Sequence, residues 1–166
     1  DNKELTFRAE VFPANASYRD EVEYRITTVL GIASNLAASI AFAGKKVVIV
    51  GLDIRKPRLA GLFNLAKSDR GISNFFTRSY DDYDYLESLI QKSDISPNLD
   101  IIAAGPVPPN PAELLEKRNL ETAVEYLKKK YDYVLLDTAP IGLVSDTLAI
   151  GKVADATLFI VRANYT

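Results

Sequence analysis

Two aspartates in this sequence each follow a short apolar run and are followed within a few residues by a proline. Asp53 comes after the β-branched run 47–50 and Gly51, and Asp137 comes directly after the run 133–136. Unbroken apolar runs of this length are typical of strands buried on both faces of a parallel sheet. Because the carboxyl ends of parallel strands meet at one edge of a sheet, we expect both carboxylates to face one crevice.

Two carboxylates in one crevice repel each other unless a cation lies between them. Mg²⁺ that carries a nucleotide phosphate fits such a pair, because it takes one or two carboxylates, keeps water and accepts phosphate oxygens. Arg55 adds a positive group on the loop that Pro57 ends. Two alternatives stay open: Asp53 beside Arg55 is a solvated surface turn, and Asp137 caps the turn that follows its strand.

Composition narrows the chemistry that the chain can perform. The sequence has 166 residues, 48% hydrophobic and 25% charged, which is ordinary for one globular domain. A net charge of −2 gives no electrostatic footprint for nucleic acid, so we expect no nucleic-acid partner. The sequence contains no cysteine and no histidine, which excludes thiolate metal sites and histidine-based catalysis. Carboxylates, hydroxyls, Lys, Arg and backbone amides must therefore carry any reaction.

The elements that must position these residues alternate between strand and helix patterns. This alternation predicts an α/β fold, with a parallel sheet covered by helices on both faces. Gly44 lies where the first predicted helix would end in a left-handed cap, and the proline-rich segment 106–111 is expected to be irregular. The predicted strands are 4–12, 26–30, 47–50, 99–103, 133–136 and 157–161, and the predicted helices are 33–42, 71–76, 84–90, 112–130 and 146–150.

Three longer stretches make the chain similar to a known family. They are ASNLAASIAFAGKKVVIVGLDIRKPRLAGLF (33–63), LDIIAAGPVPPNPAELL (99–115) and YDYVLLDTAPIGLVSDTLAIGKVADATLFIVR (131–162). Over residues 33–166 the sequence resembles the cytoplasmic domain of bacterial tyrosine kinases (BY-kinases) of capsular and exopolysaccharide export. These kinases are a branch of the MinD-like P-loop ATPases, so the resemblance implies a P-loop NTPase-like fold.

The resemblance also implies roles for individual residues. Asp137 matches the Walker B acid, which holds Mg²⁺ through water. Asp53 matches the second acid of the family's Asp-x-Asp, and Arg55 matches the basic residue that follows it. These three are the expected catalytic residues, and the two aspartates are the expected metal ligands. Asn35 and Thr138, together with both aspartates, are expected to contact the nucleotide.

The sequence departs from the family pattern in two places. Gly51 stands where the first acid of Asp-x-Asp is expected, so any proton-accepting role of that acid would pass to Asp53. The phosphate-binding loop is also missing, because this class needs a glycine-rich loop with Lys and Ser/Thr before a helix. Only Leu-Gly-Ile-Ala-Ser, without a lysine, lies between residue 29 and Asn35.

Taken literally, such a chain cannot bind ATP in the standard way. Our preferred hypothesis is that residues 1–32 are linker and arm pieces that precede the kinase domain and are discontinuous with it. Residues 33–166 would then be a partial kinase domain that lacks its P-loop and its tyrosine-rich C-terminal tail.

We therefore expect an autophosphorylating, ATP- and Mg²⁺-dependent protein-tyrosine kinase that regulates capsular or exopolysaccharide polymerisation and export. The resemblance implies a homo-oligomer that phosphorylates tyrosines in trans, at the cytoplasmic face of the bacterial inner membrane, beside a polysaccharide co-polymerase region or partner. The alternatives are a MinD- or ParA-like ATPase and, if the full protein has no P-loop, a non-catalytic interaction module. Tyr80, Tyr83 and Tyr85 lie among aspartates and could be phosphoacceptors or part of a solvated acidic loop.

Overall fold

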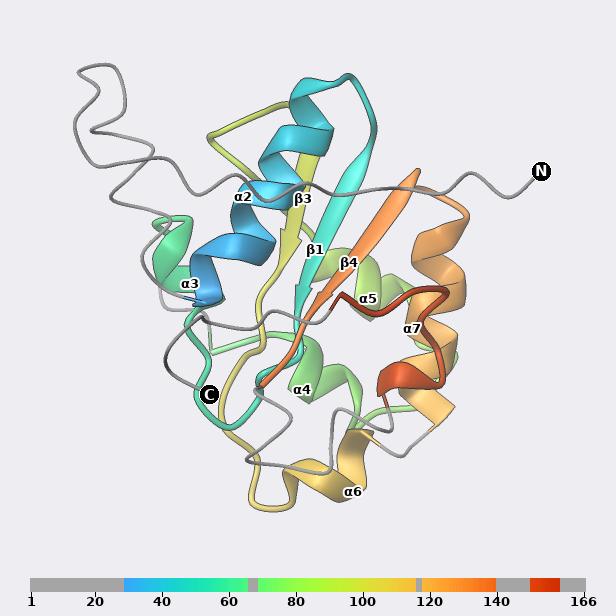
Figure 1. Cartoon of the computed structure of the whole chain (residues 1–166). Coiled ribbons are helices and arrows are strands. Elements are labelled where there is room, and N and C mark those ends of the chain that lie inside the picture. The colour runs from blue at the N-terminus through green and yellow to red at the C-terminus, as the bar shows by residue number, and fades with distance from the viewer. Residues whose placement is uncertain (1–28, 66–68, 116–117, 140–149, 159–166) are drawn as a thin grey trace.

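A four-stranded mixed sheet forms the centre of the structure (Figure 1). The structure is a computed structural model, and it describes residues 29–65, 69–115, 118–139 and 150–158. The strand order is β2-β3-β1-β4. The central strand β1 (Val47–Gly51) pairs in parallel with β3 (Leu99–Ile102) and with β4 (Tyr133–Asp137). The two-residue strand β2 (Gln91–Lys92) pairs antiparallel with β3. The parallel strands predicted near 47, 99 and 133 are thus confirmed, whereas β2 was not predicted.

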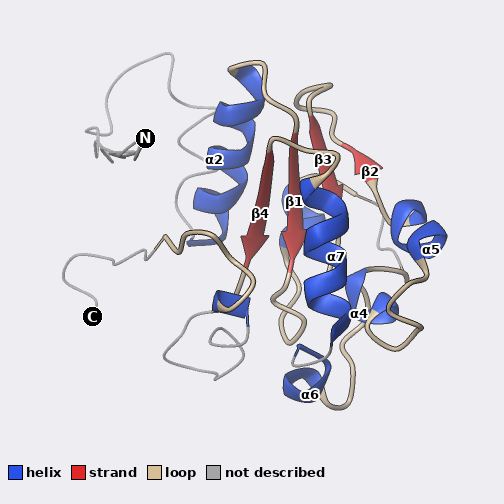
Figure 2. Ribbon diagram, turned by 90° about the vertical axis from the view of Figure 1, so that its right-hand side faces the viewer, coloured by secondary structure: helices blue, strands red, loops and turns tan. Residues whose placement is uncertain are grey.

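Helices cover both faces of the sheet, as predicted (Figure 2). On one face, Ala37 and Ala41 of α2 (Val29–Phe42) pack in a core cluster with Val47 and Ile49. Val48 and Val50 point to the other face and its larger core cluster. That second face is covered by α4 (Ile72–Phe75), α5 (Tyr83–Ser88) and α7 (Arg118–Lys128), and two short helices, α3 (Leu59–Leu62) and α6 (Pro111–Leu115), lie toward the carboxyl edge of the sheet.

Helix α2 begins earlier than the sequence predicted. We expected a strand over 26–30, but Val29 and Leu30 belong to the helix, so that prediction is wrong for these two residues. The helix extends from the alanine-rich segment toward its amino end, and this extension outweighs the β-propensity of Val29 and Leu30. The helix ends where predicted, with Gly44 at φ +82°. The chain then reverses into β1, so that the amino end of α2 lies at the carboxyl edge of the strands (Figure 1).

The remaining predictions divide by region. The helices expected near 71–76 and 84–90 are confirmed as α4 and α5. The single helix expected over 112–130 is found as α6 and α7, on either side of residues 116–117, which lie outside the described residues. The predicted strand 4–12 and most of the predicted elements 146–150 and 157–161 also lie outside them, and Thr157 and Leu158 are not in a strand.

Among the residues that the structure describes, no helix is long and apolar enough to cross a membrane.

A close backbone approach anchors α4 to the carboxyl end of β3. The Ile72 amide donates to the Ala103 carbonyl at 2.9 Å, and the Ser73 amide donates to the Ala104 carbonyl at 3.0 Å. A Cβ atom at Gly71 would lie 2.2 Å from the Gly105 nitrogen and 2.5 Å from the Ala103 oxygen. Only glycine can therefore occupy position 71 without displacing the segment that leaves β3.

We predict that Gly71→Ala destabilises the protein by about 3 kcal/mol, because the added methyl group meets backbone atoms that cannot move independently. The matched control is Gly61→Ala in α3, where a Cβ meets nothing within 4 Å. That control should be neutral or stabilising by up to about 1 kcal/mol. Urea denaturation followed by circular dichroism measures both, and equal stability of the two variants would contradict the close approach.

Candidate functional site

The pairing of β1 with β4 brings Asp53 and Asp137 together at the carboxyl edge of the sheet. Gly51 lies opposite Asp137 in the parallel register. The carbonyl of Asp137 accepts hydrogen bonds from the amides of Leu52, at 2.8 Å, and Asp53, at 3.1 Å. The loop that leaves β1 is therefore held against the end of β4, and both aspartates lie at the same edge, as expected from their sequence pattern.

The two carboxylates differ in their environment. Asp137 is 8% exposed, and burial, followed by the charge of Asp53, raises its pKa from the usual 3.8 to about 6. Asp53 is half-buried, and its Oδ1 accepts a hydrogen bond from the Lys56 amide at 3.0 Å. The two carboxylates thus repel each other, because the charge of Asp53 acts on the buried Asp137. A cation between them would remove this repulsion.

The other predicted site residues lie at the same edge or on segments that lead to it. Thr138 follows Asp137 directly and is half-buried, whereas Arg55 is exposed on the loop after β1. Asn35 lies in the second turn of α2, whose amino end is at this edge (Figure 1). Its Nδ2 atom is enclosed and has no hydrogen-bond partner among the described residues. An enclosed amide donor without a partner is unusual in a folded protein.

Gly51, which replaces an expected acid, is tightly packed. A Cβ atom at this position would lie 3.2 Å from the Ala104 nitrogen and 3.2 Å from Leu59 Cδ2. The side chain of Leu59, from α3, therefore closes the space in which an acid at position 51 would begin. Sequence reasoning missed Leu59, because its contact with Gly51 depends on the position of α3 and leaves no pattern in the sequence.

The donor set fits Mg²⁺ better than it fits a triphosphate. Within the described ranges no group of three or more acidic, histidine or cysteine side chains could hold a metal, so the site offers a pair of carboxylates. A pair suits Mg²⁺, which keeps several waters. The sequence contains no Gly-Lys-Ser/Thr loop, and the positions where one is expected, near 31–35, lie inside helix α2. The described residues therefore fit the metal and do not by themselves form the phosphate cradle.

Known proteins of one family resemble this chain over most of its length. The family described as "AAA domain" matches residues 27–165. A putative tyrosine-protein kinase in the cps region of Klebsiella pneumoniae is 39% identical over 136 residues, which cover 79% of this chain and 17% of that protein. Tyrosine-protein kinase CpsD of Streptococcus agalactiae serotype III (strain NEM316) is 31% identical over 131 residues, covering 79% of this chain and 54% of that protein.

Solved structures show the same relationship. The kinase domain of the Escherichia coli tyrosine kinase ETK superposes with a TM-score of 0.67 and 32% identity, over 74% of this chain and 46% of that one. MinD from Pyrococcus horikoshii, solved with Mg-ADP, has a TM-score of 0.55 and 22% identity, over 71% and 46% of the two chains, and shares the fold. The resemblance to bacterial tyrosine kinases and the P-loop NTPase-like fold are thus confirmed. The chain spans about half, or less, of these relatives' length.

We predict that Asp137→Asn stabilises the protein at pH 7.5 by at most about 3 kcal/mol, the free energy that corresponds to the raised pKa. Between pH 4 and 6 the unfolded chain releases a proton that folded Asp137 still holds. The wild type therefore loses stability as the pH rises through this range, and an amide at position 137 does not.

Urea denaturation in metal-free buffer at pH 4.5 and 7.5 tests this expectation. The gain should be smaller at pH 4.5, and Asp94→Asn, at an exposed position, should show no such difference. An Asp137→Asn variant that is less stable than the wild type at pH 7.5 would show that the buried charge is already compensated.

Proposed function

This chain belongs to the AAA domain family, and from that premise we propose that it forms the core of an ATP-dependent protein-tyrosine kinase. The observation that carries the proposal is the pair Asp53 and Asp137, held side by side at the carboxyl ends of neighbouring parallel strands. Open α/β sheets bind ligands at this edge. Relatives named tyrosine-protein kinases, including one in a cps region, support the kinase over other uses of the fold.

The proposed roles follow from the environment of each side chain. Bound Mg²⁺ would neutralise phosphate oxygens, and Asp53 and Asp137 are its proposed ligands, Asp137 through water. Asp53 is the more exposed of the two and has no acidic neighbour at position 51, so it is also the proposed acceptor of the tyrosine proton. Arg55 would add positive charge on the approach to the site. Asn35 and Thr138 are proposed nucleotide contacts, which the unpartnered Asn35 amide supports. In such a site positioning and charge neutralisation supply most of the rate.

The phosphate-binding loop is the part that the proposed kinase requires and this sequence lacks. We infer that the intact gene encodes a Gly-Lys-Ser/Thr loop at the junction near residues 31–35, between the linker-like segment and Asn35. In this proposal residues 1–32 belong to arm and linker pieces, and residues 33–166 are part of the kinase domain. Sequencing the gene across this junction tests the inference directly, and a gene without such a loop would contradict it.

The setting of the kinase is proposed from its relatives. The cps-region kinase places one relative with capsule genes, which supports a role in capsular or exopolysaccharide polymerisation and export. The proposed assembly is a homo-oligomer that phosphorylates tyrosines in trans, at the cytoplasmic face of the bacterial inner membrane and beside the polysaccharide co-polymerase.

A second candidate function is a MinD-like ATPase. The fold shared with MinD supports it. An ATPase of this type would hydrolyse ATP in water and leave no phosphotyrosine. The third alternative, a non-catalytic module, would bind no nucleotide.

We predict that protein from the intact gene, incubated with Mg²⁺ and ATP, accumulates phosphotyrosine, measured by immunoblot and mass spectrometry. Asp137→Asn should lower the initial rate by about 100-fold or more, because it removes a charged group that holds the metal. Asp94→Asn is the matched control and should retain the wild-type rate.

The possible failures are distinguishable. Nucleotide binding and phosphate release without phosphotyrosine would replace the kinase with the ATPase. Absence of nucleotide binding would leave only the interaction module. A fully active Asp137→Asn variant would keep the kinase but contradict the role given to Asp137.

A further inference from the structure

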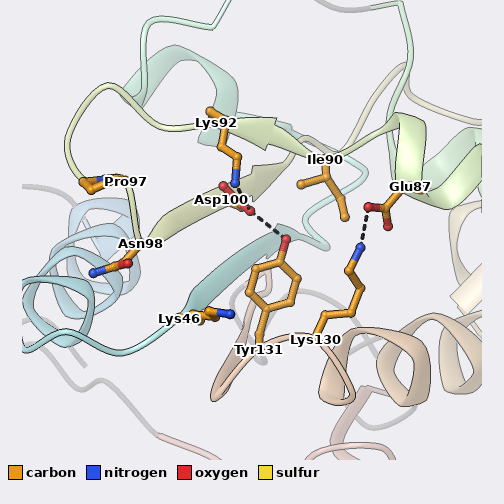
Figure 3. A pocket seen from close by; sticks show the side chains of 9 residues that line it. All are labelled: Lys46, Glu87, Ile90, Lys92, Pro97, Asn98, Asp100, Lys130 and Tyr131. Atoms are coloured by element: carbon orange, nitrogen blue, oxygen red, sulfur yellow. Dashed lines mark hydrogen bonds and ion pairs between the residues drawn. The ribbon is translucent and has the colours of Figure 1, made fainter.

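A polar cavity of about 380 Å³ lies at the edge of the sheet opposite the carboxylate pair (Figure 3). Three of its lining residues lie just before the amino ends of the parallel strands. Lys46 immediately precedes β1, Asn98 immediately precedes β3, and Tyr131 lies two residues before β4. The cavity is therefore separate from the site at the carboxyl ends.

Asp100 of β3 forms one wall of this cavity, and its side chain is 7% exposed. Its Oδ2 accepts hydrogen bonds from the Tyr131 hydroxyl at 2.7 Å and from Lys92 Nζ at 2.9 Å. These bonds offset the cost of burying a carboxylate. Burial and the bond to Asp100 raise the pKa of Tyr131, so its hydroxyl remains a donor at physiological pH. Asp100 Oδ1 is enclosed and has no hydrogen-bond partner among the described residues, so a ligand in the cavity does not contact this atom.

A second carboxylate faces the cavity from α5. Glu87 pairs with Lys130, which follows α7, and also accepts a hydrogen bond from the Tyr126 hydroxyl at 2.9 Å. The hydrogen bond with Lys130 lowers the pKa of Glu87, and the same contact raises the pKa of Lys130. Both groups are therefore charged at neutral pH. Each carboxylate of the cavity is thus already neutralised by a lysine of its own.

Lys46 is the exception among the lysines of the cavity. None of the described residues forms an ion pair with its ammonium group, and Asp132 is hydrogen-bonded to the backbone of Lys46. The Lys46 amide donates to Asp132 Oδ2 at 2.8 Å, and its carbonyl accepts from the amides of Asp132 and Tyr133 at 2.9 and 3.1 Å. The cavity therefore combines one ammonium group that has no ion pair among the described residues with neutralised carboxylates, of which the exposed Glu87 can still accept hydrogen bonds.

We propose that this cavity binds a small phosphate ester that carries hydroxyl groups, with the phosphate on Lys46 and the hydroxyls toward Glu87 and Asn98. Lysine binds phosphate as a point charge. Hydroxyls suit carboxylates that already have counter-ions, because they donate hydrogen bonds without adding charge, whereas an amine would compete with Lys92 and Lys130. A volume near the lower end of ligand pockets, which run from roughly 300 to 1,000 Å³, suits a molecule as small as a hexose phosphate.

Isothermal titration calorimetry of the protein with glucose 1-phosphate tests the proposal. We expect saturable binding that Lys46→Gln weakens by about tenfold or more, the effect of losing one charged hydrogen bond. Lys45→Gln is the matched control, since Lys45 is the neighbouring exposed lysine and does not line the cavity. This control should bind as tightly as the wild type.

Two further probes separate the parts of the ligand. Inorganic phosphate and glucose should each bind about tenfold more weakly than the ester. Inorganic phosphate that binds as tightly as glucose 1-phosphate would overturn the hydroxyl contacts. The site itself would be overturned if Lys46→Gln bound glucose 1-phosphate as tightly as the wild type, or if the wild type gave no saturable heat. Asp53→Asn should leave binding unchanged, because a loss there would place the ligand at the opposite edge. None of these outcomes depends on kinase activity.

Discussion

The parallel register of β1 with β4 is the constraint on which the candidate site depends. It places Gly51 opposite Asp137 and gives the Asp137 carbonyl two amide donors, from Leu52 and Asp53. A slip of one residue would turn every side chain of a strand to the other face. Since all of β1 is buried, the core does not permit such a slip. Hydrophobic packing therefore holds Asp53 and Asp137 at one edge of the sheet, although their like charges repel each other.

The buried acids at the two edges of the sheet have different neighbours. At the carboxyl edge, Asp137 is buried beside another acid and its pKa rises to about 6. At the amino edge, Asp100 is buried to a similar degree but is bonded to Tyr131 and Lys92. A buried acid that lacks a cation raises the free energy of the folded state, and a bound ion can recover that energy. The carboxyl edge would therefore gain from a bound metal ion, whereas Asp100 already pairs with Lys92.

Local pattern predicted β1, β3 and β4 and the edge at which Asp53 and Asp137 lie, because short apolar runs bounded by turn residues are typical of strands. It also predicted the left-handed turn at Gly44, which follows from the short-range geometry of a helix end. It did not predict β2, since two residues carry no periodicity. The contact of Leu59 with Gly51 and the hydrogen bond from Tyr131 to Asp100 join distant segments. Such contacts are set by tertiary packing and cannot be found from one sequence.

Joint binding of a hydrated divalent cation by Asp53 and Asp137 is tested most directly with Mn²⁺, a paramagnetic substitute for Mg²⁺. Electron paramagnetic resonance measures free Mn²⁺ during a titration of the protein. The wild type should take up one ion at pH 7.5, and about tenfold less tightly at pH 5, where Asp137 holds a proton. Asp53→Asn and Asp137→Asn should each weaken uptake at pH 7.5. Equal uptake by the wild type and both variants would show that the two carboxylates do not share a metal.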